Sequence, residues 1–271
     1  MIDRCVIKPC GITAICTPVD SNTRDVILPL NVVEDPVLQL SCISNAEFDE
    51  LAADVILPQY VLFDEDARLP YCDLLVKNLK TLRPTKWLDD EVINFYLELL
   101  VRRSSSDPDS PKVFCLTTFL YPKFISKERG GYQLVRRWTK KLDIFQADVI
   151  LFPINLGNFH WALVSVNLKE KRVLYHDSFG TNNRYCLRKI HDYLLEEHQD
   201  KKGTPIDYTN FTFSVDRSAP RQSNGFDCGV FLLKYADCIT RGMPLTFDKQ
   251  DVTKFRKKIM FEILKGELTR D

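Results

Sequence analysis

Hydrophobic side chains recur at helical spacing after residue 88 of this chain. Val92, Phe95, Tyr96 and Leu99 form an apolar stripe, because residues three or four positions apart lie on one face of a helix. Acidic residues begin this stretch and arginines end it, which suits the helix dipole. The pattern predicts a helix over residues 89–103. Similar spacing predicts further helices over residues 132–141, 185–198, 228–239 and 249–264.

Short apolar or β-branched runs bounded by turn residues lie between these helices, as is typical of buried strands. They cover residues 149–154, 161–166, 172–176 and 211–215. Helices, then strands, then helices predict an α+β domain. Residues 1–58 instead contain five prolines, which break helices and interrupt sheet ladders. We therefore divide the chain into an N-terminal extension of unknown role, residues 1–58, and a domain over residues 59–271.

The charges balance over the whole chain but not along it. The 37 basic and 37 acidic residues give a net charge of zero, which argues against nucleic acid as a partner. Residues 1–66 carry three basic and twelve acidic side chains, a local charge of −9. This segment is either a solvated acidic extension or one that docks onto the basic remainder and affects substrate access. We expect no membrane insertion, because no apolar run approaches about 20 residues, and the first residues lack the pattern of a secretion signal.

The cysteines favour a reducing, intracellular setting. There are nine of them, an odd number, and no two are spaced as CxxC. A disulfide framework or a zinc site therefore has little support, and we expect no metal and no other cofactor.

Two of the predicted strands form a hairpin that brings a histidine and an acid together. A short polar turn over residues 168–171 joins residues 161–166 to residues 172–176. Folding about this turn places His160 opposite Asp177 or its close neighbour, and directly opposed residues have Cβ atoms about 5 Å apart. The carboxylate can then accept a hydrogen bond from one imidazole nitrogen and leave the other free to act as a base. Taken alone, such a pair fits a structural role as well as a catalytic one.

Cys228 is the candidate nucleophile for this pair. A polar loop containing Gly225 leads into Cys228, where an apolar helix is predicted to begin. The positive end of a helix dipole favours a thiolate, but it contributes only about 0.3–1 kcal/mol, or about 2 kcal/mol at best. Most of the stabilisation must therefore come from an imidazolium, for which we expect His160. Backbone N–H groups at the helix start and the side-chain amide of Gln222 can face a developing oxyanion.

The other candidates are weaker. Cys238 lies ten residues along the same predicted helix, too far in to use its N-terminus. Cys115 and Cys186 lack a glycine-containing approach. His176 adjoins Asp177, but strand alternation directs it to the opposite face.

Six segments of the chain resemble the motifs of one known family, in the family's order. They are residues 87–96, 131–141, 159–163, 175–178, 222–229 and 234–240. On these motifs the chain resembles the ubiquitin-like protease family, the SUMO-specific (sentrin-specific) cysteine proteases. The resemblance implies a papain-like fold with a central mixed or antiparallel sheet flanked by helices. It also implies that Cys228 attacks, His160 serves as general base and acid, Asp177 orients the imidazole and Gln222 lines the oxyanion hole.

The same resemblance implies a set of substrate-binding residues. Trp87 and Trp161 would enclose the Gly-Gly tail of the substrate, since a tunnel between two indoles admits residues without a Cβ. Without the resemblance, both indoles fit a role as core aromatics. Asp90 resembles an acid that meets an arginine of SUMO, and Phe119 would line the same surface. The family often has asparagine where this chain has Asp89, a change that we expect to alter surface charge without touching catalysis.

The predicted function is SUMO-specific hydrolysis after a C-terminal Gly-Gly, in isopeptides to target lysines and in SUMO precursors. The expected partners are SUMO and SUMO-conjugated proteins, and we expect a monomer. Two alternatives stay open: a protease for another ubiquitin-like modifier, and an inactive SUMO-binding module. The resemblance implies a nuclear location, with some protein in the cytoplasm. Arg256 begins a short basic cluster on the last predicted helix, for which we expect a solvated face rather than an import signal.

Overall fold

A mixed sheet of five strands forms the centre of the domain. The computed structural model describes residue 74 and residues 76–126 and 130–269, so the predicted extension over residues 1–58 lies outside the described residues. The strands are β1 (Val113–Cys115), β2 (Val149–Leu156), β3 (His160–Asn167), β4 (Arg172–His176) and β5 (Thr212–Val215). They are ordered β1-β2-β3-β4-β5. The pairs β2–β3 and β3–β4 are antiparallel, and the edge strands β1 and β5 run parallel to their neighbours.

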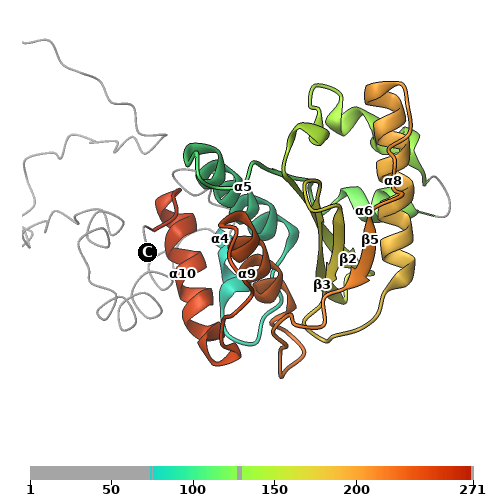
Figure 1. Ribbon diagram of the computed structural model, residues 1–271. Helices are drawn as coiled ribbons and strands as arrows, with labels where there is room; N and C mark the ends of the chain where they lie inside the picture. Colours follow the sequence, from blue (N-terminus) through green and yellow to red (C-terminus); the bar gives the residue numbers. More distant parts are fainter. Residues whose placement is uncertain (1–73, 75, 127–129, 270–271) are drawn as a thin grey trace, which may run out of the picture.

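Helices cover both faces of this sheet, as Figure 1 shows. They are α4 (Val76–Leu79), α5 (Asp90–Ser106), α6 (Leu120–Ile125), α7 (Tyr132–Val135), α8 (Arg184–Lys202), α9 (Cys228–Thr240) and α10 (Val252–Lys265). Short 3-10 turns occur at Lys80–Leu82, Arg136–Thr139, Ile144–Gln146 and Lys249–Asp251. Helices α5, α9 and α10 pack on one face, and α6 and α8 pack on the other. The α+β prediction is confirmed.

Strand alternation explains how both faces are filled. In β2 and β3, Leu151 and Leu163 point into the hydrophobic core under α5, α9 and α10. Their neighbours Phe152 and Val164 point into the second core under α6 and α8. Successive side chains of a strand point to opposite faces, so a strand covered on both sides must be apolar at nearly every position. This is why these segments are uninterrupted hydrophobic runs in the sequence.

The fold brings the start of β3, the end of β4 and the start of α9 to one edge of the sheet. The last β3–β4 pair is Leu163 with His176, so Asp177 lies directly after this ladder, and His160 lies at the start of β3, where it pairs with Leu156 of β2. Helix α9 packs against β3 and α5, which sets Cys228 beside this edge.

Three local predictions differ from the structure. Residues 132–141 do not form one helix: α7 ends at Val135, whose φ of −109° departs from the value of about −63° in a regular α-helix, and a 3-10 turn follows. The helix predicted over residues 89–103 ends later than expected, because α5 continues to Ser106. The predicted solvated face at Arg256 is wrong for that residue, since its side chain is buried.

Candidate active site

His160 and Asp177 are joined by a direct hydrogen bond. His160 Nε2 lies 2.7 Å from Asp177 Oδ1. Burial lowers the pKa of His160, but the interactions with Asp177 and with Cys228 outweigh it and raise the pKa to about 9. The second ring nitrogen, Nδ1, is buried and has no hydrogen-bond partner among the described residues. The imidazole therefore has one nitrogen bound to the acid and one available towards the thiol.

Asp177 is held as an anion by the turn that follows β4. Its carboxylate accepts hydrogen bonds from the backbone N–H of Phe179 at 2.9 Å and of Thr181 at 3.2 Å, and from the Thr181 hydroxyl. Burial raises the pKa of Asp177, but the bonds from His160, Thr181 and Phe179 outweigh it, so the pKa lies below its usual range. A fixed anion at this position orients the imidazole and stabilises its charged form.

Phe179 is a site residue that sequence reasoning missed. Its ring stacks on the His160 ring with centroids 4.7 Å apart and planes 27° apart. The available signal was its place in the turn directly after Asp177, where a bulky side chain can fold back over the pair. The stack covers one face of the imidazole, while the hydrogen bond to Asp177 lies in the ring plane, so the two together restrict the orientation of the ring.

Cys228 is the first residue of α9 and is 2% exposed. It therefore lies at the positive end of the helix dipole, as the sequence predicted. The other described thiols are unsuited to attack: burial raises the pKa of Cys115 and Cys186 to about 12 and also raises the pKa of Cys238. Only Cys228, among the cysteines that the structure describes, interacts with a histidine that is paired to an acid.

Gln222 is anchored within the loop that leads to Cys228. Its Nε2 donates to the Asn224 carbonyl at 2.5 Å, and its Oε1 accepts from the Ser178 hydroxyl at 2.6 Å. The Gln222 backbone N–H also donates to the Ser178 carbonyl at 3.0 Å. Since the amide has two N–H donors and one bonds to Asn224, the second is available to an oxyanion.

Each of the two predicted tunnel tryptophans is held by a hydrogen bond from its indole to a backbone carbonyl. Trp87 is 46% exposed and donates its indole N–H to the Gly225 carbonyl at 2.8 Å. Trp161 is only 7% exposed and donates its indole N–H to the Leu88 carbonyl at 3.0 Å. Trp87 thus presents an open indole face, while Trp161 is largely part of the core. Their roles towards a substrate stay predictions.

Asp90 and Phe119 lie on neighbouring elements outside the triad. Asp90 is the first residue of α5 and is partly exposed. Phe119 precedes α6 and is 45% exposed. The structure therefore leaves both side chains accessible on the surface, and contact with a substrate is a prediction for them.

Asp89 has a structural role that differs from the expected change in surface charge. Its carboxylate accepts from the Val92 N–H at 2.9 Å and caps α5, and it accepts from Asn78 Nδ2 at 2.7 Å. Burial is the main reason that the pKa of Asp89 is raised. The side chain thus stabilises the start of the helix that carries Asp90.

A second histidine–aspartate pair lies in the same sheet but is closed to substrate. His176 Nδ1 lies 2.9 Å from Asp216 Oδ2, and its Nε2 lies 2.8 Å from Ser165 Oγ. His176 is 2% exposed, and its ring lies 5.8 Å from that of Tyr235 on α9. The predicted orientation away from Asp177 is confirmed, and the group ties β3, β4 and the end of β5 together beneath α9.

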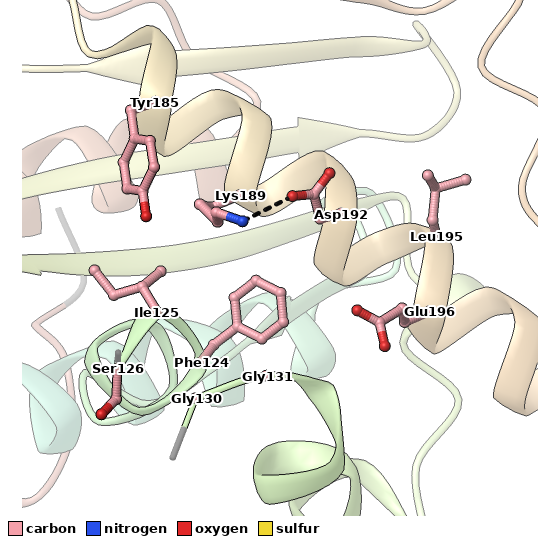
Figure 2. Close-up of a pocket in the computed structure, with 10 residues that line it drawn as sticks. All are labelled: Phe124, Ile125, Ser126, Gly130, Gly131, Tyr185, Lys189, Asp192, Leu195 and Glu196. Atoms are coloured by element: carbon pink, nitrogen blue, oxygen red, sulfur yellow. Dashed lines mark hydrogen bonds and ion pairs between the residues drawn. The ribbon is translucent and has the colours of Figure 1, made fainter. Parts of the chain in front are cut away.

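The pocket between α6 and α8 is separate from this chemistry. It has a volume of about 500 Å³, and Figure 2 shows Lys189 paired with Asp192 at 3.1 Å on the α8 side. None of the candidate catalytic residues lines it. Within the described part of the chain, no group of three or more His, Cys, Asp or Glu side chains is arranged to hold a metal ion. No helix among the described residues is long and apolar enough to cross a bilayer.

A thiol at the start of a helix, with a histidine and an aspartate on the adjoining antiparallel strands, defines a cysteine protease of the papain-like class. Comparison with known proteins makes the assignment more specific. Residues 86–268 match the model of the Ulp1 protease family, C-terminal catalytic domain. The chain belongs to this family.

Individual relatives agree with the family match. Sentrin-specific protease 2 of Rattus norvegicus is 41% identical over 193 residues, 70% of this chain and 32% of that protein. A sentrin-specific protease of Caenorhabditis elegans is 38% identical over 192 residues, 71% of this chain and 27% of that protein. The chain thus covers less than a third of the length of these curated relatives. The solved C-terminal Ulp1 protease domain in complex with Smt3, the yeast ortholog of SUMO, superposes with a TM-score of 0.67 at 29% identity, over 83% of this chain and 96% of that chain.

Proposed function

We propose that this chain is a SUMO-specific cysteine protease that cleaves after the C-terminal Gly-Gly of SUMO. The observation that carries the proposal is the placement of His160 between Asp177 at 2.7 Å and the Cys228 thiol, at the edge where α9 begins. The named activity of the sentrin-specific relatives and the Smt3 complex of the structural neighbour support SUMO as the substrate class.

The chemistry follows from the charges at this edge. The Cys228 thiolate attacks the carbonyl carbon of the terminal glycine, and the developing oxyanion faces the N–H groups at the start of α9 and the Gln222 amide. The C–N bond breaks as the His160 imidazolium donates its proton to the leaving amine. Water then loses a proton to His160 and attacks the thioester, and the C–S bond breaks, which restores the Cys228 thiolate and releases the SUMO carboxylate. The leaving amine is the lysine of a target in deconjugation, or the next residue of the precursor in maturation.

The tail selectivity follows from the two indoles. Trp87 bonds to the cysteine loop and Trp161 adjoins the histidine, so a chain that passes between them reaches the thiol. Glycine fits because it lacks a Cβ. We assign Asp90 and Phe119 to the surface that holds the folded part of SUMO, where Asp90 would pair with an arginine.

Two experiments test the function. A panel of ubiquitin-like proteins with C-terminal vinyl sulfones separates the substrate classes: the SUMO probe should label Cys228, and labelling by another modifier alone would reject the SUMO assignment. Cys228→Ala should still bind SUMO and lose all cleavage of both precursor and conjugate. Cleavage that survives this substitution would remove Cys228 from the mechanism, and binding without cleavage by the unaltered chain would show an inactive SUMO-binding module.

We further propose that the chain acts as a monomer without insertion into membranes, mainly in the nucleus, with SUMO-conjugated proteins as its targets. These assignments rest on the family resemblance. Light scattering of the purified chain tests the first, and imaging of the tagged chain tests the location. A dimer in solution, or a tagged chain confined to a membrane, would contradict them.

A further inference from the structure

Arg256 is a buried charge that the proposed chemistry does not use. It lies on α10 with 3% of its surface exposed. Taking a guanidinium out of water is unfavourable unless charges and hydrogen bonds compensate it. The partners of Arg256 therefore indicate what this residue does.

Those partners belong to the two loops that form the active site. Arg256 Nε and Nη2 donate to Asp227 Oδ1 at 3.0 and 2.6 Å. The guanidinium also donates to four backbone carbonyls, those of Thr81 at 3.2 Å, Arg83 at 3.2 Å, Lys86 at 2.8 Å and Phe226 at 3.2 Å. One carbonyl, that of Lys86, directly precedes Trp87, and Asp227 directly precedes Cys228. The Arg256 guanidinium thus holds the residues that directly precede Trp87 and Cys228.

The hydrogen bonds continue from Asp227 to the candidate oxyanion-hole residue. Asp227 Oδ2 accepts from Asn224 Nδ2 at 2.6 Å, and Asn224 Oδ1 accepts from the Asp227 N–H at 3.1 Å. The Asn224 carbonyl accepts from Gln222 at 2.5 Å. Arg256 is therefore connected to Gln222 through the Asp227 side chain and then through the side chain and backbone carbonyl of Asn224. The Trp87 indole bonds to the Gly225 carbonyl in the middle of this loop.

The same guanidinium also balances charge next to the nucleophile. Asp227 is buried and adjoins Cys228, and an unpaired carboxylate there would oppose a thiolate. Lysine in place of Arg256 would keep the positive charge but lose the planar fork, which a point charge cannot replace.

We propose that Arg256 is a positioning residue that aligns the Trp87 loop with the loop from Gln222 to Cys228, and so couples binding of the substrate tail to attack. The proposal rests on the proposed function and adds a residue that does not touch the substrate. It implies that loss of the fork affects both KM and kcat, whereas loss of the Asp227 charge affects the cysteine loop alone.

The test compares how three variants of this chain cleave SUMO that carries a C-terminal fluorogenic amide. All variants are assayed at a temperature at which urea titration shows that they are folded. Arg256→Lys should lower kcat and raise KM, with kcat/KM at least tenfold lower. Asp227→Asn should lower kcat several-fold and leave KM within twofold. Tyr96→Phe is the matched control, because Tyr96 donates a buried 2.6 Å hydrogen bond to Glu262 of the same helix α10. It should reduce stability and leave both constants within twofold.

Alkylation of the thiol by iodoacetamide provides a readout that is independent of SUMO. Arg256→Lys should slow alkylation of Cys228 several-fold near neutral pH because the cysteine loop loses its alignment, and Tyr96→Phe should not. If the unaltered chain did not cleave SUMO, the proposed function would fail while this readout still tested Arg256. If Arg256→Lys does not fold, the kcat and KM of Asp227→Asn provide the test of the proposal. A folded Arg256→Lys variant whose kcat and rate of Cys228 alkylation equal those of the wild type would overturn the proposal.

Discussion

Replacement of Asp177 by asparagine gives the sharpest test of the charge arrangement. Asp177→Asn keeps the shape of the side chain and removes the anion 2.7 Å from His160 Nε2. A hydrogen bond to a charged group contributes about 1.5–3 kcal/mol, which corresponds to about 10- to 150-fold in rate at about 1.4 kcal/mol per tenfold. We expect kcat/KM for SUMO cleavage to fall by that factor.

The pH profile gives an independent measure of the same effect. His160 has a pKa of about 9 in the folded protein against an ordinary value of 6.5, so its imidazolium is present below pH 9 and is lost as the pH rises through that value. The alkaline limb of kcat/KM, which reports the free enzyme, should therefore lie near pH 9. Asp177→Asn should move it towards 6.5. If the pKa of His160 fell to 6.5, the protonated fraction of its imidazole at pH 8 would fall from about 90% to about 3%. This loss agrees with the fall in kcat/KM that we expect.

Asp216→Asn is the matched control, since Asp216 makes the same kind of bond to His176 at 2.9 Å. It should reduce stability and leave the alkaline limb in place. NMR titration of His160 in a Cys228→Ala background measures the contribution of Asp177 without the thiol, and the chain has only four histidines to assign. An alkaline limb near pH 9 in Asp177→Asn would refute the assignment of Asp177.

Five further substitutions test other parts of the site. Gln222→Ala should lower kcat by about 10²–10³ with little change in KM, and steady-state kinetics with an unchanged kcat would remove Gln222 from the oxyanion hole. A Cβ on Gly229 would lie 2.9 Å from Leu88 Cβ, while a Cβ on Gly225 would meet nothing within 4 Å. Urea unfolding should therefore show that Gly229→Ala is about 1–3 kcal/mol less stable than wild type and that Gly225→Ala is nearly unchanged. Equal effects of the two substitutions would contradict the packing argument. Asp89→Ala should cost about 0.5–2 kcal/mol through loss of the helix cap. Asp89→Asn should lie between Asp89→Ala and wild type in urea unfolding, because its single amide oxygen can keep the bond from the Val92 N–H but cannot also accept from Asn78.

Local signals in the sequence were enough to find the candidate catalytic groups. The hairpin depends on a turn near residue 169 and on alternation along two short strands, so it predicts that His160 and Asp177 approach each other. The Cys228 helix depends on apolar spacing that begins at a glycine-containing loop. These properties are set by residues close together in the chain, and the structure confirms the pairing and the helix start. The edge strand β1 was missed because three residues carry too little periodicity.

Tertiary structure alone decided how the site is supported. Arg256 lies four residues after Val252 and four before Met260, so helical spacing places it on the buried stripe of α10. Its charge suggested a solvated face instead, because nothing near it in the sequence reveals Asp227, 29 positions earlier. By itself the sequence determined the candidate catalytic groups, since motif and periodicity are local properties. The folded chain decided which buried charges meet, since that pairing depends on contacts between segments far apart in the sequence.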